Sequence, residues 1–130
     1  MTTKILSVDD SSLMRLAIAR VFAPYDCLVL QAEDGEKGFA ATVEHRPDLI
    51  ILDYNMPVLD GVGMLRKLRG DPQVARTRVI MLTANSAPEI VATVARLGVR
   101  DYLIKPFDDE TLLGKAAKLI ALVPKTPTES

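Results

Sequence analysis

The sequence predicts an α/β fold with a single parallel sheet of five strands and five helices. Short apolar runs alternate with longer segments whose apolar residues recur with helical periodicity, which is the pattern of successive β–α units. The run at residues 49–52 reads Leu-Ile-Ile-Leu without polar alternation, as expected of a strand buried on both faces. At 130 residues the chain has the size of one domain with a full core.

The expected elements form five β–α pairs along the chain. The strands are expected at residues 4–8, 27–31, 48–52, 78–82 and 100–104. The helices are expected at residues 12–22, 34–45, 61–69, 86–97 and 108–123. The third helix starts after Asp60, a favourable N-cap, and the first and third helices end near Pro24 and Gly70. The loops that remain are short, as compact α/β domains prefer.

The last two helices carry clear start signals. Ser86-Ala87-Pro88-Glu89 matches a capping box with proline in the first turn of the helix. At the other end of that helix, Gly98 can adopt the left-handed conformation that often follows the last helical turn. The final helix is expected to open at Asp108 and to bury one apolar stripe. That stripe consists of Leu112, Leu113, Ala116, Leu119, Ile120 and Val123. The domain is therefore assigned to residues 1–123, and the polar residues 124–130 are expected to be a disordered tail or the start of a linker.

Composition narrows the class of protein. The net charge is −1 with acids and bases interspersed, so the basic stripe of a nucleic-acid-binding protein is absent. Five bases do cluster, and a solvated helix face explains them better than a phosphate-binding patch. They are Arg66, Lys67, Arg69, Arg76 and Arg78. No apolar run approaches the roughly 20 residues of a membrane-spanning helix. With one cysteine and no signal-like start, the expected location is the cytoplasm.

Carboxylates, a hydroxyl and an ammonium group follow four of the predicted strands. Asp9-Asp10 follows the first strand, Asp53 the third, Thr83 the fourth and Lys105 the fifth. In an open parallel sheet, ligands bind outside the carboxyl ends of the strands. Carboxylate oxygens are the ligands that Mg²⁺ prefers, and three carboxylates with one lysine sum to a charge of −2 that one divalent cation would neutralise. The sequence therefore predicts a site for Mg²⁺ and a phosphoryl group.

These residues and their neighbours resemble the receiver domains of two-component response regulators, in particular those of the chemotaxis type. The motifs stand in the family's order and cover residues 4 to about 123. They are Asp9-Asp10, Asp53-Tyr54-Asn55-Met56-Pro57, Asp60-Gly61, Thr83-Ala84 and Asp101-Tyr102-Leu103-Ile104-Lys105-Pro106-Phe107. The resemblance implies a flavodoxin-like doubly wound sheet with strand order 2-1-3-4-5, an order that belongs to the family and does not follow from the residues themselves.

The resemblance also implies the roles of the acidic residues. Asp53 would be the phosphoacceptor, which takes a phosphoryl group from a phosphohistidine of a histidine kinase or phosphotransfer protein. Asp9 and Asp10 would hold Mg²⁺ together with the Asp53 side chain and the main-chain carbonyl of Asn55. The protein would then be a phosphoacceptor in signal transduction rather than an enzyme, assisting only its own phosphorylation and dephosphorylation.

The remaining motif residues are implied to transmit the signal. Thr83 and Lys105 would bind the phosphoryl oxygens, and Tyr102 would turn inward when Thr83 moves toward the phosphate. The peptide bond before Pro106 would be cis. The output would be the binding of a target protein at the surface formed by the fourth helix, the fifth strand and the fifth helix. Direct contact with nucleic acid and insertion into a membrane are not expected.

Three other interpretations share some of these features. A flavin- or nicotinamide-binding domain could share the fold, but Asp9-Asp10 would repel a phosphate from the first β–α turn. An aspartate-dependent phosphatase normally places its nucleophile after the first strand, whereas Asp53 follows the third. The chain could also be a receiver module cut from a larger response regulator or hybrid kinase.

Overall fold

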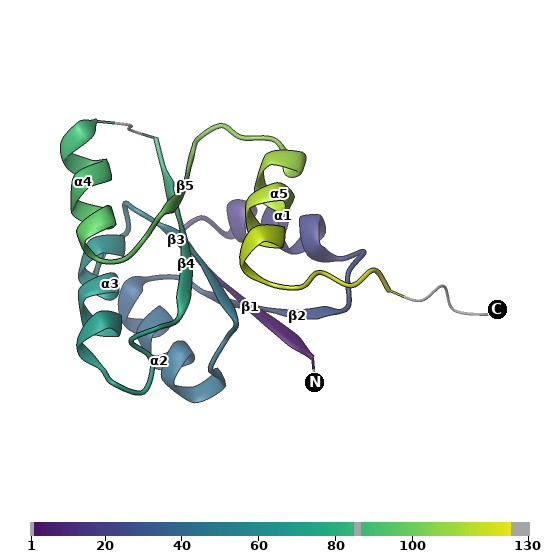
Figure 1. Ribbon diagram of the computed structural model, residues 1–130, viewed down its shortest axis with the longest axis horizontal. Helices are drawn as coiled ribbons and strands as arrows, with labels where there is room; N and C mark the ends of the chain where they lie inside the picture. The colour runs from purple at the N-terminus through teal and green to yellow at the C-terminus, as the bar shows by residue number, and fades with distance from the viewer. Residues whose placement is uncertain (1, 85–86, 126–130) are drawn as a thin grey trace.

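A parallel sheet lies between two layers of helices in the computed structural model, which describes residues 2–84 and 87–125 (Figure 1). The strands are β1 (Thr3–Val8), β2 (Cys27–Ala32), β3 (Leu49–Asp53), β4 (Arg78–Thr83) and β5 (Asp101–Ile104). The helices are α1 (Ser12–Phe22), α2 (Gly35–His45), α3 (Gly61–Gly70), α4 (Pro88–Arg96) and α5 (Asp109–Leu119). The strand order is β2-β1-β3-β4-β5 with every pair parallel, which confirms the predicted fold class and order.

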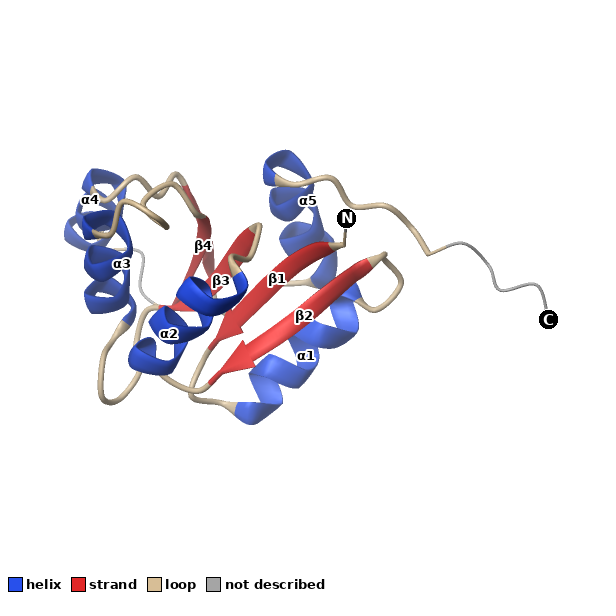
Figure 2. Ribbon diagram, turned by 90° about the horizontal axis from the view of Figure 1, so that it is seen from below, coloured by secondary structure: helices blue, strands red, loops and turns tan. Residues whose placement is uncertain are grey.

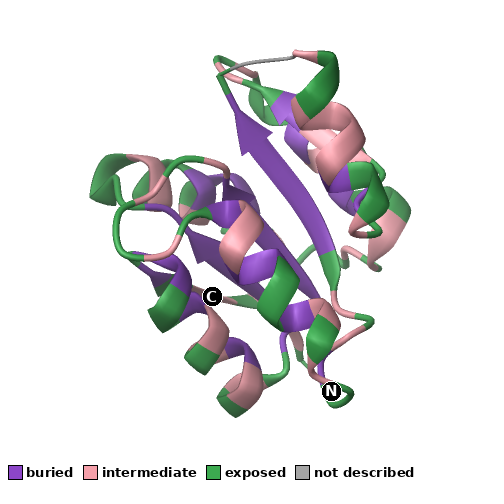
Figure 3. Ribbon diagram, turned by 90° about the vertical axis from the view of Figure 1, so that its left-hand side faces the viewer, coloured by how far each residue is buried: buried purple, intermediate pink, exposed green. Residues whose placement is uncertain are grey.

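The alternation of side chains divides the core into two clusters, one on each face of the sheet. Leu6, Ile50 and Met81 belong to the cluster that packs under α2, α3 and α4. Ile51 and Leu82 belong to the cluster that packs under α1 and α5. Figure 2 shows α1 and α5 on the opposite side of the sheet from α2 and α3, and Figure 3 shows strands that are buried while the helices expose their outer faces. All five residues of β3 are buried, as predicted for a central strand.

Side chains cap the start of four helices, as predicted for Asp60 and Asp108. Ser11, Asp34, Asp60 and Asp108 each occupy an N-cap, where the side chain accepts a hydrogen bond from the N–H three residues later. Gly98 follows α4 with a φ of 82°, the left-handed conformation predicted for it. The helix α4 begins at Pro88 with Ala87 at the N-cap, one residue later than the predicted capping box. Ser86, the predicted cap, lies outside the described residues.

The last helix is shorter than predicted. It ends at Leu119, so Val123 does not join its buried stripe and is 57% exposed. Ile120 is already extended, and the chain then pairs with the loop between α1 and β2. The N–H of Asp26 donates to the Val123 carbonyl at 2.6 Å, and an antiparallel bridge joins Tyr25 to Pro124. These tertiary backbone bonds replace helical ones, and Pro124 disfavours helix at the residue before it.

The predicted disordered tail is only partly described by the structure. Pro124 is held by the bridge to Tyr25, and the N–H of Lys125 donates to the Pro24 carbonyl at 2.9 Å. These two residues of the predicted tail therefore make backbone contacts with the loop between α1 and β2. Residues 126–130 lie outside the described part of the chain. Within the described residues, no helix is both long enough and apolar enough to cross a bilayer.

The loop between β3 and α3 is fixed by close backbone packing at two glycines. The N–H of Gly61 donates to the Tyr54 carbonyl at 3.0 Å, and the N–H of Gly35 donates to the Leu59 carbonyl at 2.9 Å. A Cβ at Gly61 would lie 2.5 Å from the Asp53 carbonyl oxygen, too close for any side chain. Within this loop Val58 is 77% exposed and has a φ of 69°, in the left-handed region.

Replacing Gly61 by alanine should destabilise the fold, because backbone atoms of β3 would have to move to admit the Cβ. We expect a loss of about 1–3 kcal/mol in the free energy of unfolding, measured by urea denaturation. Gly114→Ala is the matched control, since no atom outside the neighbouring helix backbone lies within 4 Å of its Cβ position and the residue sits in α5. The control should gain about 0.5–1 kcal/mol from the better helix propensity of alanine. Equal midpoints for the two variants would contradict this account.

Candidate functional site

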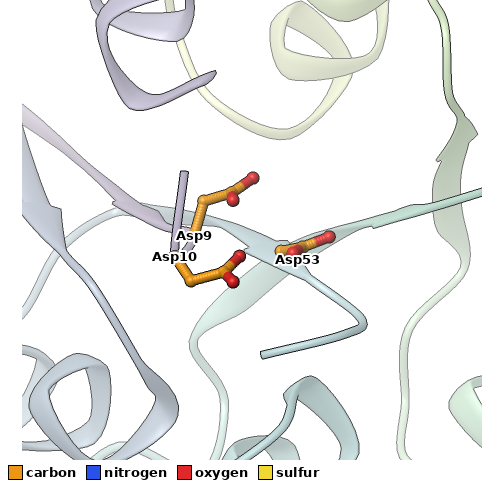
Figure 4. A group of neighbouring side chains, drawn as sticks. All are labelled: Asp9, Asp10 and Asp53. Carbon is orange, nitrogen blue, oxygen red and sulfur yellow. The ribbon is translucent and has the colours of Figure 1, made fainter. Parts of the chain in front are cut away.

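The carboxyl ends of β1 and β3 meet where the winding of the sheet reverses. From β1 the chain continues to β2 at one edge, and from β3 it continues to β4 and β5 toward the other. Ligands of doubly wound sheets bind in the crevice at such a reversal. Val8 pairs with Leu52 in the parallel register of β1 and β3, so the next residues along the two strands, Asp9 and Asp53, are neighbours. Figure 4 shows Asp9 and Asp10 following β1 and Asp53 at the end of β3.

Three carboxylates converge at this crevice. Asp9, Asp10 and Asp53 each offer one oxygen, and these three oxygens lie within 4.8 Å of one another. Asp9 and Asp53 are buried, with 1% and 5% of their surface exposed, whereas Asp10 is exposed. The structure therefore brings together the three acids that the sequence grouped as metal ligands.

One oxygen of Asp9 lacks a hydrogen-bond donor among the described residues. Its Oδ1 accepts from the N–H of Ser11 at 2.9 Å, but its Oδ2 is buried and unsatisfied. The nearest cation is the Lys105 ammonium at 3.7 Å, which is too far for a hydrogen bond. A buried anionic oxygen without a partner is costly. This orphaned oxygen, beside two further carboxylates, fits a site built for a cation.

The surroundings make Asp9 hard to ionise. Burial raises the pKa of the Asp9 carboxyl above its usual value, and the charges of Asp53 and Asp10 act in the same direction. The Ser11 N–H and the Lys105 ammonium oppose these effects without cancelling them. The folded protein therefore binds a proton at Asp9 more readily than the unfolded chain does.

Lys105 reaches the cluster from the far side of β4. Its Nζ donates to Asp53 Oδ1 at 2.8 Å, and its N–H donates to the Thr83 carbonyl at 2.8 Å. Burial alone would lower the pKa of the Lys105 ammonium, but the hydrogen bond and charge of Asp53, together with Asp9, outweigh it and raise the pKa. The bond between Lys105 and Pro106 is cis, which confirms that prediction.

Thr83 and Tyr102 lie on one face of the sheet and Asp53 on the other. Asp53 is two residues after Ile51, whose side chain belongs to the cluster under α1 and α5. Thr83 is two residues after Met81, which belongs to the opposite cluster, and is 2% exposed. Tyr102 stands opposite Met81 in the register and packs, half-buried, against that same cluster. Asn55 lies exposed in the loop after β3.

Arg15 supports the acidic turn and was not identified from the sequence. Its Nη1 donates to the main-chain carbonyl of Asp9 at 2.6 Å, and its Nε donates to Gln31 Oε1 at 3.1 Å. It thus ties the turn after β1 to the end of β2. In the sequence, Arg15 is visible only as a basic residue in a helix that starts beside two aspartates. Such an arrangement is too common to identify Arg15 as part of the site.

The comparison with known families agrees with the geometry. Residues 5–117 match the model of the response regulator receiver domain. The chain belongs to this family, as the motifs predicted, and its function is that of a receiver in two-component phosphorelay signalling.

Its relatives include proteins of the chemotaxis type. The chemotaxis protein CheY of Bacillus subtilis is 32% identical over 115 residues, which cover 87% of this chain and 93% of that protein. A solved structure of the chemotaxis protein CheY4 of Vibrio cholerae has a TM-score of 0.86 at 32% identity, covering 92% of this chain and 100% of that one.

A second similar structure contains ligands. The CheX–CheY–BeF3–Mg complex of Borrelia burgdorferi matches with a TM-score of 0.81 at 25% identity, over 89% of this chain and 87% of that one. Other curated relatives are longer, and the chain spans 52% of the length of several transcriptional regulators.

The raised pKa of Asp9 predicts how stability depends on pH in metal-free buffer. Because the folded pKa is raised, ionised Asp9 destabilises the protein at neutral pH, and this penalty fades as the pH falls through the folded pKa toward the unfolded value. Asp9→Asn keeps an oxygen for the Ser11 N–H and should raise the free energy of unfolding by about 0.5–2 kcal/mol at pH 7. The gain over wild type should shrink in acid.

Asp108→Asn provides the contrast for that measurement. Hydrogen bonds from Thr111 lower the pKa of the Asp108 carboxyl, so its stabilising effect is present at neutral pH and is lost as the pH falls through the folded pKa. Chemical denaturation across pH should therefore give differences from wild type of opposite sign for the two variants. A gain for Asp9→Asn that does not change with pH would exclude Asp9 ionisation as its cause.

Proposed function

We propose that Asp53 is the phosphoacceptor of this receiver and that Asp9, Asp10 and the Asn55 carbonyl hold Mg²⁺ beside it. The observation that carries the proposal is the convergence of three carboxylate oxygens within 4.8 Å, with the Lys105 ammonium 2.8 Å from Asp53. Bound Mg²⁺ would supply positive charge to the phosphoryl oxygens. The similar complex from Borrelia burgdorferi contains Mg, which supports this choice of cation.

The chemistry assigned to Asp53 is nucleophilic. One carboxylate oxygen attacks the phosphorus of a phosphohistidine, the O–P bond forms as the N–P bond breaks, and the imidazole nitrogen leaves with its electron pair and takes up a proton. The product is an aspartyl phosphate. The donor is a histidine kinase or a phosphotransfer protein. We place this step in the cytoplasm, and we assign the chain no activity on other substrates.

Lys105 and Thr83 are assigned to the phosphoryl oxygens. In this structure Lys105 bonds Asp53 itself, so it holds the carboxylate in place before phosphorylation. Once the carboxylate is esterified, the ammonium can pair with a phosphoryl oxygen at the same position. Thr83 ends the strand next to β3, and its main chain is joined to Lys105 by a hydrogen bond. The two residues therefore respond to the phosphoryl group as a connected pair.

The signal leaves through the face on which Thr83 lies. Movement of Thr83 toward the phosphoryl group would vacate space in the cluster against which Tyr102 packs. That cluster also contains Val94 of α4, so a turn of Tyr102 would alter the surface formed by α4, β5 and α5. Glu89 and Arg96 are exposed on α4 and would face the target protein. We propose this surface as the output site.

The same module could also act within a longer protein. The chain spans 52% of several relatives that are transcriptional regulators, so their receivers are joined to further sequence. In that arrangement the α4–β5–α5 surface would act on an attached domain instead of a separate target.

Phosphorylation by acetyl phosphate tests the assignment of Asp53. Wild-type protein incubated with acetyl phosphate and Mg²⁺ should gain the mass of one phosphoryl group, read by intact mass spectrometry, and should gain none when EDTA removes the metal. Asp53→Asn should stay unmodified, whereas Asp48→Asn, an exposed aspartate at the other end of β3, should behave as wild type. Modification of Asp53→Asn to the wild-type extent would assign the acceptor elsewhere.

Thr83→Ala tests the switch separately from the chemistry. With Mg²⁺ and beryllofluoride as the phosphoryl mimic, the side-chain resonances of Tyr102 should shift in wild type as the conformational equilibrium moves by about 1–3 kcal/mol. Thr83→Ala should still bind the mimic but lose most of the Tyr102 shift, because the hydroxyl links the phosphoryl group to β4. Thr83→Ser, which keeps the hydroxyl, should restore it. An unchanged Tyr102 response in Thr83→Ala would show that the signal takes another route.

A further inference from the structure

Four arginines surround a hollow at the end of the sheet opposite to the carboxylate cluster. This basic pocket has a volume of about 470 Å³ and is lined by Arg69, Arg76, Arg78 and Arg96, together with Leu97 and Gly98 among others. Arg78 begins β4 and Thr83 ends it. At about 3.3 Å per residue, roughly 17 Å of strand separates the pocket from the phosphoryl site. The pocket therefore plays no direct part in the chemistry proposed above.

The floor of the basic pocket is held in place by Arg69. Its Nε donates to the Leu97 carbonyl at 2.7 Å, and its Nη1 donates to the carbonyls of Ala75 and Thr77 at 3.0 Å and 2.8 Å. One guanidinium thus joins the end of α4 to the loop between α3 and β4. Such a fixed floor lowers the entropic cost of binding a ligand.

The other three arginines have no anionic partner among the described residues. Arg76, Arg78 and Arg96 are exposed, and none of them forms an ion pair with an acid of the described chain. No acidic residue lines the hollow. The neighbouring acids are engaged elsewhere, because Asp71 accepts the N–H of Gln73 and Asp101 lies 4.0 Å from the Lys115 ammonium. In a chain of net charge −1, this is a local concentration of positive charge.

We propose that the basic pocket binds a small anion that carries two or more phosphoryl groups, such as a nucleoside polyphosphate. Guanidinium groups bind phosphoryl oxygens in a bidentate manner, and two or more phosphoryl groups match the charge of several arginines within a small volume. The volume is in the range of small-ligand pockets. The arginines gather in one hollow instead of following a stripe, which favours a compact anion over a nucleic-acid strand.

Titration with tripolyphosphate in Mg²⁺-free buffer tests the proposal. Calorimetry should show saturable binding to one site. In ¹⁵N-resolved spectra, the amide shifts should be confined to residues 76–78 and 96–98, leaving Thr83 and Lys105 unmoved. Arg76→Gln combined with Arg78→Gln should weaken binding by at least about 10-fold, because each charged hydrogen bond contributes about that factor.

The matched control removes two exposed arginines that do not line the pocket. Arg20→Gln combined with Arg66→Gln makes the same change in net charge on α1 and α3 and should leave the affinity within about 2-fold of wild type. Equal weakening by both double variants would overturn the proposal, as would shifts centred on Thr83 and Lys105. Tighter binding of a poly-glutamate peptide or of single-stranded RNA at the same arginines would also overturn it, by assigning the pocket to a macromolecule.

Discussion

Repulsion among three carboxylates at the ends of β1 and β3 is the constraint on which the rest of this structure depends. The fold packs Asp9 and Asp53 almost out of contact with water and provides one ammonium, from Lys105, for both. The remaining negative charge destabilises the metal-free protein, and a cation bound there, as proposed, would relieve this destabilisation and bind more tightly for it. The two apolar clusters on either side of the sheet supply the stability that lets the domain carry this cost.

The parallel sheet also separates Asp53, the proposed acceptor, from Thr83 and Tyr102. Neighbouring strands bring Asp53 and Thr83 to the same rim, but their side chains belong to opposite faces because of the alternation along each strand. The Asp53 carboxylate lies on the side covered by α1 and α5. Thr83 and Tyr102 lie on the side covered by α4. If Asp53 is the acceptor as proposed, a change there would reach the packing under α4 through Thr83, on the face opposite to Asp53 itself.

Much of this arrangement could be predicted because it depends on local pattern. Strand runs, caps such as Asp60 and the polar residues after four of the strands are visible in the sequence, and together they predict the fold class and the carboxylate site. Tertiary backbone contacts are not visible in this way. The predicted end of α5 is wrong because the chain leaves the helix after Leu119 and residues 123–125 pair with the loop between α1 and β2, which is distant in the sequence. The cluster of bases was interpreted as one solvated face, yet Arg69 turns inward to three carbonyls.

The backbone at Val58 is strained, so the loop beside the site could be made more stable by a substitution at this residue. A β-branched residue in the left-handed region costs about 1–2 kcal/mol, and the side chain is too exposed to recover that cost by burial. Glycine or asparagine would adopt the same conformation with less strain. A single surface substitution could thus stabilise the domain without any change to its acidic residues. Engineering or evolution could use this loop to compensate for the destabilising effect of the clustered carboxylates.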